Sequence, residues 1–196
     1  MNKDLFSDII LAATTNQEEV LEKLAENDDF IVQTIVARNL NTSQKVLDVL
    51  SNSIHIHDIV KLEAVKNPNI SFKSLKNIMS SYDANHPDFD ESCDEEECII
   101  GMMYCSIAEF SVNQKILSLL YKKGDVDAFL ACNTNISNKI LEKLSKHTHH
   151  NIRSNVAENP NTSIKTLKTL LLDKEEFIQE NVKLNLIKKK NLKLFI

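Results

Sequence analysis

The four cysteines are the side chains of this chain most able to hold a metal ion or an iron–sulfur cluster. They are Cys93, Cys98, Cys105 and Cys132. Four and six residues separate the first three, whereas zinc and iron–sulfur sites usually contain two cysteines only two residues apart. The spacing therefore predicts reduced thiols without a metal or any other cofactor. A zinc or iron–sulfur protein is kept as an alternative interpretation.

Histidines form two groups that do not match a catalytic pattern. His55 and His57 fall in a connecting segment, and His147, His149 and His150 precede a predicted helix. The second group has no acidic or cysteine partner at a metal-binding spacing. No nucleophile elbow, metalloprotease motif or catalytic carboxylate pair is present, and 2 glycines in the whole chain argue against a phosphate-binding loop. We therefore expect that the protein is not an enzyme.

Lysine recurs two residues after the serine or asparagine that is expected to begin a helix. The five positions are Lys45, Lys73, Lys115, Lys139 and Lys165. A cation in the first turn opposes the helix dipole, so local helix stability does not explain the choice. One interpretation is a basic ridge that recognises an acidic protein surface or phosphates. The other is coincidence in a lysine-rich chain.

Charge is distributed unevenly along the sequence. The formal net charge is −5, but residues 1–112 hold 8 basic and 20 acidic side chains, and residues 113–196 hold 15 basic and 8 acidic ones. Residues 83–98 alone contain 8 acidic and no basic side chains. We expect a solvated acidic loop over 82–98, inserted into the surrounding pattern. A calcium site is not expected there, because the EF-hand pattern with its central glycine is missing.

The lysine column belongs to a repeated pattern, Asn-x-Asn-[Thr/Ile]-Ser followed by paired leucines or isoleucines. Its four clear copies are Val36–Ser43, Ala64–Ser71, Leu130–Ser137 and Val156–Ser163. Two degenerate copies and a partial last copy extend the series, with anchor positions at 13, 39, 67, 109, 133, 159 and 185. Neighbouring anchors are 24 to 28 residues apart except for one step of 42, which contains the acidic segment. The pattern predicts seven units.

Each unit is predicted to be a helix, a tight corner and a second helix. Asn39, Asn67, Asn133 and Asn159 are expected to end the first helix in the left-handed conformation. Thr15 and Glu18 are spaced as a capping box at the start of a second helix. One helix pair cannot bury both of its apolar stripes, so neighbouring pairs must stack into a continuous core. The sequence thus predicts a single all-α domain over 1–196, an α-solenoid of about seven short helix-pair repeats.

The copy at Val156–Ser163, followed by Leu167 and Leu170, resembles the leucine-rich repeat variant family of bacteria. The family's unit reads Val-Ala-x-Asn-Pro-x-Thr-Pro, and the resemblance covers roughly residues 10–80 and 104–187. It implies a right-handed superhelix related to armadillo and HEAT arrays, and a binding scaffold without a common catalytic activity. Some members couple such repeats to a cysteine-ligated iron–sulfur module. This chain departs from the family in that serine replaces the second proline.

These patterns favour a non-catalytic protein-interaction scaffold that binds an acidic partner along its second helices. The alternative is nucleic-acid binding by the basic C-terminal half, which is weakened by the presence of only two arginines, Arg38 and Arg153. No membrane association is expected, because the longest uncharged apolar stretch, 98–108, is too short to span a bilayer. Without a signal-peptide pattern at the N-terminus, we expect a soluble cytoplasmic protein.

Overall fold

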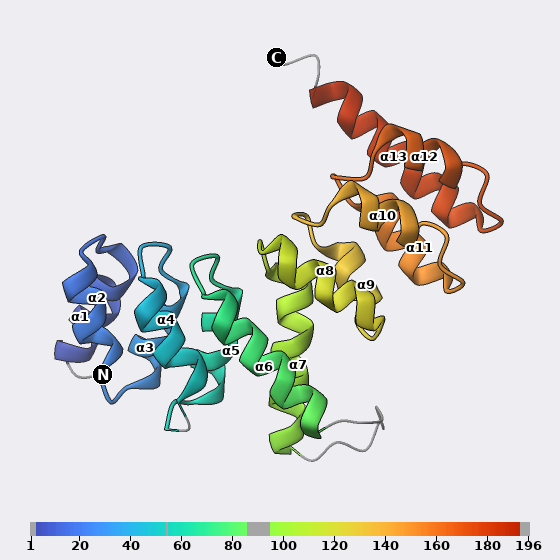
Figure 1. The fold of residues 1–196 in the computed structure, drawn as a ribbon. Helices are drawn as coiled ribbons and strands as arrows, with labels where there is room; N and C mark the ends of the chain where they lie inside the picture. Colours follow the sequence, from blue (N-terminus) through green and yellow to red (C-terminus); the bar gives the residue numbers. More distant parts are fainter. Residues whose placement is uncertain (1–2, 54, 86–94, 193–196) are drawn as a thin grey trace. The chain divides into compact units, whose positions relative to one another are not determined.

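The computed structural model describes residues 3–53, 55–85 and 95–192. These residues form thirteen helices and no strand, which confirms the predicted all-α class (Figure 1). The chain divides into two compact units, residues 1–107 and 108–196. None of the described helices combines the length and the apolar character needed to cross a lipid bilayer.

The first unit consists of helices in two layers. Its helices are α1 (Lys3–Thr14), α2 (Glu18–Ala25), α3 (Phe30–Arg38), α4 (Gln44–Asn52), α5 (Asp58–Lys66), α6 (Phe72–Asn85) and most of α7 (Glu95–Phe110). The first helices of successive pairs contact one another, α1 with α3 and α3 with α5, and so do the second helices, α2 with α4 and α4 with α6. The core between these layers includes Leu21, Val36 and Leu47, all fully buried.

The second unit contains the remaining six helices. They are α8 (Gln114–Lys123), α9 (Asp127–Cys132), α10 (Asn138–Leu144), α11 (His150–Glu158), α12 (Ile164–Leu170) and α13 (Glu176–Leu192). Helix α11 contacts α9 on one side and α13 on the other, and α10 and α12 pack against this row of first helices. Helices as short as α10 and α12, each of 7 residues, are marginal alone and depend on this packing.

The paired apolar residues of the repeat face the core, as predicted. In six second-helix copies the pair is at most 7% exposed: Leu21 and Leu24, Leu47 and Leu50, Leu75 and Ile78, Leu117 and Leu120, Leu141 and Leu144, Leu167 and Leu170. Their three-residue spacing places both side chains of a pair on one helix face. At roughly 2 kcal/mol for each buried Leu or Ile, these stripes are a main source of stability.

Two parts of the predicted pattern differ from the structure. The sequence predicts a loop over 82–98, but residues 82–85 complete α6 and residues 95–98 begin α7, while 86–94 lie outside the described residues. The partial last copy predicts a corner at Asn185, but α13 runs through this position as one helix of 17 residues. The sequence around Asn185, from Lys183 to Lys190, contains no proline or glycine, so nothing in it interrupts the helix.

Candidate partner-binding surface

The asparagine at each corner joins its helix-pair repeat to the preceding repeat. The Nδ2 group of Asn159 donates hydrogen bonds to the carbonyl oxygens of Ala131 (2.8 Å) and Asn133 (2.9 Å). Asn67 donates in the same way to Ala37 (2.8 Å) and Asn39 (3.0 Å). The same double donation is made by Asn39, Asn133 and Asn185. We call this series the asparagine ladder.

The ladder explains the asparagines better than the left-handed conformation that the sequence suggested. Asn39, Asn67, Asn133 and Asn159 have φ between −62° and −68°, so that prediction is wrong. Of the described residues, only Gly124 has a positive φ. The asparagine Oδ1 also accepts a hydrogen bond from the backbone N–H two residues later, at 2.6–3.0 Å in the four clear copies. One side chain thereby satisfies three backbone groups at a buried corner.

The acceptors also correct the alignment of the two degenerate copies. Asn39 donates to the carbonyl oxygens of Ala12 and Thr15, and Asn133 donates to those of Ala108 and Ser111. Thr15 and Ser111 thus occupy the place of the corner asparagine, two residues after the predicted anchors 13 and 109. The predicted capping box is absent: Glu18 is the first residue of α2, and the Thr15 Oγ1 accepts a hydrogen bond from the Gln17 N–H (3.1 Å).

The five lysines predicted to form a ridge are all exposed in the first turns of second helices. Two of them already have partners on the preceding second helix. Lys45 lies 3.1 Å from Glu22, and Lys165 lies 3.4 Å from Glu142. Within the described part of the chain, Lys73, Lys115 and Lys139 form no ion pair. The preceding helix therefore accounts for two of the five lysines without any binding partner.

A broader lysine surface covers the second helices of the second unit. Helices α8, α10 and α12 carry seven exposed lysines: Lys115, Lys122, Lys123, Lys139, Lys143, Lys165 and Lys168. Their one acidic residue is Glu142, the partner of Lys165. Lys123 lies 3.9 Å from Asp125, and the Lys143 ammonium lies 5.4 Å from the centre of the Tyr121 ring. We call this surface the lysine face. The ridge prediction singled out three of its seven lysines.

Both arginines are occupied within the protein. The Arg153 guanidinium donates from Nε to Asp173 Oδ2 (2.7 Å) and from Nη2 to Oδ1 (3.0 Å), and its Nη1 reaches the carbonyl oxygens of His147 and Thr148. Arg38 donates from Nε to Glu63 (2.8 Å). The Arg153 hydrogen bonds hold the pKa of Asp173 below its usual value, despite the burial that opposes this. The planar fork of Arg153 is therefore fully used inside the protein, whereas Arg38 is 58% exposed and uses only its Nε for Glu63.

The Arg153–Asp173 pair was not predicted, although the repeat contains a signal for it. Asp173 lies 20 residues after Arg153 and Asp127 lies 20 residues before His147, 3.9 Å from its imidazole. Arg153 and Asp127 each lie six residues before a corner asparagine, Asn159 or Asn133. Their partners, Asp173 and His147, each lie twelve residues before the next asparagine of the series. Burial raises the pKa of Asp127, and the nearby His147 opposes this rise.

Two other histidines, His57 and His149, begin helices as N-caps. The Nδ1 atoms of His57 and His149 accept hydrogen bonds from the backbone N–H groups of Ile59 and Asn151, each at 3.3 Å. His57 also stacks on Phe30, with ring centroids 4.6 Å apart. His149 is thus an N-cap rather than part of an unstructured loop, and His57 serves α5 in the same role.

The described cysteines do not form a metal site with their neighbours. In the described residues no group of three or more His, Cys, Asp or Glu side chains is placed to hold a metal ion. Cys105 is half-buried, and Cys132 is exposed. Partial burial raises the pKa of the Cys132 thiol, and Glu109 and Glu158 raise it further. Cys93 and the side chain of Cys98 lie outside the described residues, so the prediction for these two stays open.

No protein-family model, curated protein or solved structure matches the chain. The lysine face gathers seven exposed lysines and one glutamate on three helices of the second unit, and we take it as the candidate site.

Proposed function

We propose that the protein is a non-catalytic interaction scaffold, built as a right-handed α-solenoid of about seven units, which binds an acidic surface of a protein partner. The proposal follows the resemblance to the leucine-rich repeat variant family. It is supported by the packing of alternate helices within each unit and by the asparagine ladder, which recurs at the repeat period. Solenoid proteins present extended surfaces of this kind to partners.

The observation that carries the proposal is the charge of the lysine face. Seven exposed lysines and one glutamate occupy three helices in one unit, and that glutamate is already paired with Lys165. Like charges held close together repel one another, and carboxylates from a partner relieve this repulsion. Electrostatic complementarity also speeds association and rejects partners of the wrong charge. An acidic protein surface fits these requirements.

Nucleic acid is the second candidate, because phosphates are also anions. The lysine face favours it, but both arginines are engaged in internal ion pairs. Lysine offers a point charge rather than the planar fork that grips phosphate with two hydrogen bonds. Aromatic residues, on which bases would stack, make up 6% of the chain. These features place an acidic protein ahead of nucleic acid.

The proposal is tested with two triple variants of equal charge change. The first, Lys115→Glu, Lys139→Glu and Lys168→Glu, neutralises the net charge of the lysine face. The matched control, Lys183→Glu, Lys188→Glu and Lys190→Glu, changes exposed lysines of α13. Proteins captured from native cells by the wild type and the control, but not by the first variant, are purified and titrated directly.

An acidic partner that binds the face variant at least about tenfold more weakly, with the control close to wild type, supports the proposal. Equal losses in both variants would show a general charge effect and contradict it. Binding of a generic DNA duplex in place of any protein, with an affinity that falls steeply as salt is raised, would favour the nucleic-acid candidate instead.

A further inference from the structure

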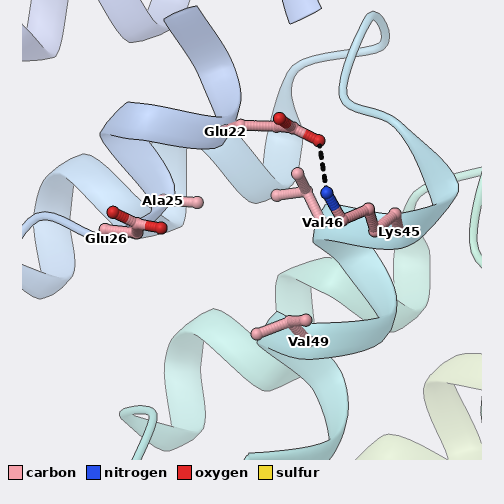
Figure 2. A pocket seen from close by; sticks show the side chains of 6 residues that line it. All are labelled: Glu22, Ala25, Glu26, Lys45, Val46 and Val49. Atoms are coloured by element: carbon pink, nitrogen blue, oxygen red, sulfur yellow. Dashed lines mark hydrogen bonds and ion pairs between the residues drawn. The ribbon is translucent and has the colours of Figure 1, made fainter. Parts of the chain in front are cut away.

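An open pocket of about 140 Å³ lies between α2 and α4 in the first unit (Figure 2). It is lined by Glu22, Ala25 and Glu26 from α2 and its C-terminal end, and by Lys45, Val46 and Val49 from α4. Figure 2 shows the Glu22–Lys45 ion pair at one end, while Ala25 projects from α2 toward the side occupied by the two valines. The pocket therefore combines an aliphatic wall with carboxylates.

The equivalent position between α4 and α6 is closed by hydrogen bonds. One repeat later, Asp48 stands in place of Glu22, Asn52 in place of Glu26 and Ser74 in place of Val46. The Ser74 Oγ donates to Asp48 Oδ1 (2.8 Å), and the Asn52 Nδ2 donates to Ser74 Oγ (2.8 Å). The polar groups on both helices satisfy one another there, so this second position has nothing to offer a ligand.

Between α2 and α4, the residues at these three positions form no hydrogen bonds with one another. Val46 cannot form a hydrogen bond, and no cation of the described residues lies within ion-pair distance of Glu26. Val49 is 60% exposed, although it is an aliphatic residue beside a pocket. The Glu22–Lys45 pair is itself exposed and contributes little to holding the pocket shut. The pocket thus leaves an apolar surface and a carboxylate available to a ligand.

The surrounding charge decides what kind of ligand fits. The lining holds two carboxylates, Glu22 and Glu26, and one ammonium group, Lys45, which is paired with Glu22. Helix α2 adds Glu18 and Glu19 against one lysine, Lys23, so the surroundings stay acidic. An anionic ligand would be repelled, and a purely apolar ligand would bury carboxylates without a partner. A lysine or arginine side chain satisfies both parts, because its aliphatic stem packs on valine while its charged end reaches a carboxylate.

We propose that this pocket binds a lysine or arginine side chain of a basic protein segment. The proposal is independent of the lysine face, which belongs to α8, α10 and α12 of the other unit and selects anions. The chain then carries two recognition sites of opposite charge. Failure at one site does not bear on the other, because their tests use different residues and different probes.

The test uses the full-length chain with isotope-labelled valine methyl groups and four synthetic pentapeptides. The peptides are identical except for a central lysine, arginine, norleucine or glutamate, with both ends blocked. We expect the lysine and arginine peptides to cause saturable shifts of the Val46 and Val49 methyl signals, and the norleucine and glutamate peptides to cause none. No saturable shift with lysine or arginine, or equal binding of norleucine, overturns the proposal.

Two variants and one control assign the binding to the pocket. Glu26→Gln removes the carboxylate, and Val49→Asn introduces the residue that stands one repeat later at Asn77. Glu26→Gln is expected to weaken lysine-peptide binding by roughly fivefold, the upper end for an exposed ion pair. Val49→Asn is expected to weaken it by a similar factor, because it removes apolar contact with the aliphatic stem of the ligand. Glu18→Gln, on the same helix but outside the pocket lining, leaves the affinity within about twofold. Unchanged binding in both pocket variants, with the methyl signals of their remaining valines unchanged, also overturns the proposal.

Discussion

Asn159 and Asn133 are joined by a hydrogen bond of 2.9 Å from the side-chain amide of the first to the main-chain carbonyl of the second. Asn185 makes the same bond to Asn159, again at 2.9 Å. Three corners, at Asn39, Asn133 and Asn159, therefore provide both a donor for the preceding corner and an acceptor for the next. Hydrogen bonds to the preceding repeat, and not a left-handed backbone conformation, explain why asparagine stands at this position.

Asn159→Asp is expected to destabilise the protein by about 3 kcal/mol, because two buried carbonyl oxygens lose their donor and face a carboxylate instead. The substitution preserves the size of the side chain, so packing changes little. Urea denaturation followed by circular dichroism measures the loss. Asn151→Asp, an exposed site in the first turn of α11, is the control and should be neutral or slightly stabilising. Equal stability of the two variants would contradict a structural role for the ladder.

The Arg153–Asp173 pair predicts an acid-sensitive contribution to stability. The pKa of Asp173 is lowered in the folded protein, chiefly by the hydrogen bonds from Arg153, so its contribution is present above the unfolded-state pKa of about 4 and is lost as pH falls through the folded-state pKa. The free energy of unfolding, measured from pH 7 down to pH 3, should therefore fall less steeply below pH 4 in Asp173→Asn than in the wild type. Parallel curves would refute the prediction.

Loss of one partner of the same pair should be costly at neutral pH. Arg153 and Asp173 side chains are only 9% and 7% exposed, so Asp173→Ala leaves a buried guanidinium without its counter-ion, at a cost of about 3 kcal/mol. The double replacement Arg153→Met and Asp173→Leu removes both charges and should cost less than the single one. Thermal denaturation of the three proteins at pH 7 makes the comparison, and a double variant less stable than Asp173→Ala would count against it.

The Lys45–Glu22 pair should contribute little by contrast. The Lys45 side chain is 79% exposed, and water screens its attraction to Glu22. Lys45→Ala is expected to change the free energy of unfolding by less than about 0.5 kcal/mol. A loss as large as that of Asp173→Ala, measured under the same conditions, would show that the lysine column is mainly structural.

Gly124 ends α8 in the left-handed conformation, with φ of 86°. Its absent side chain would meet nothing within 4 Å, so the cost of Gly124→Ala comes from the backbone alone. We expect about 1 kcal/mol of destabilisation. Ser118→Ala, at an exposed position of the same helix, is the control and should change stability by no more than about 0.5 kcal/mol in urea denaturation.

The sequence predicts those features that depend on one helix at a time. Leu167 and Leu170 identify a buried stripe because their spacing alone places them on one helix face. The recurrence locates the corner asparagines but does not show what they bind, because their acceptor atoms belong to the preceding repeat. The Arg153–Asp173 contact was missed for the same reason. Its two residues are 20 positions apart, and the packing of α11 beside α13 brings Arg153 close to Asp173, which precedes α13.

The lysine column of the sequence predicts only part of the lysine face. The column of first-turn lysines is visible in the repeat, yet Lys122, Lys143 and Lys168 fall at other positions and escape a search by column. The structure shows that these three lysines are exposed on the same helices as Lys115, Lys139 and Lys165. The same information removes Lys45 and Lys165 from the set of uncommitted charges, because each has a glutamate within reach.

The asparagine ladder bears on how the chain tolerates rearrangement. Its acceptors are main-chain oxygen atoms, which every amino acid supplies, so the joint between two units requires one particular side chain from the later unit and none from the earlier. A unit that carries its asparagine can follow any other without a matched partner residue. Duplicating, deleting or exchanging whole repeats thus preserves these hydrogen bonds, while the fit of the buried apolar side chains sets the remaining constraint on such rearrangements.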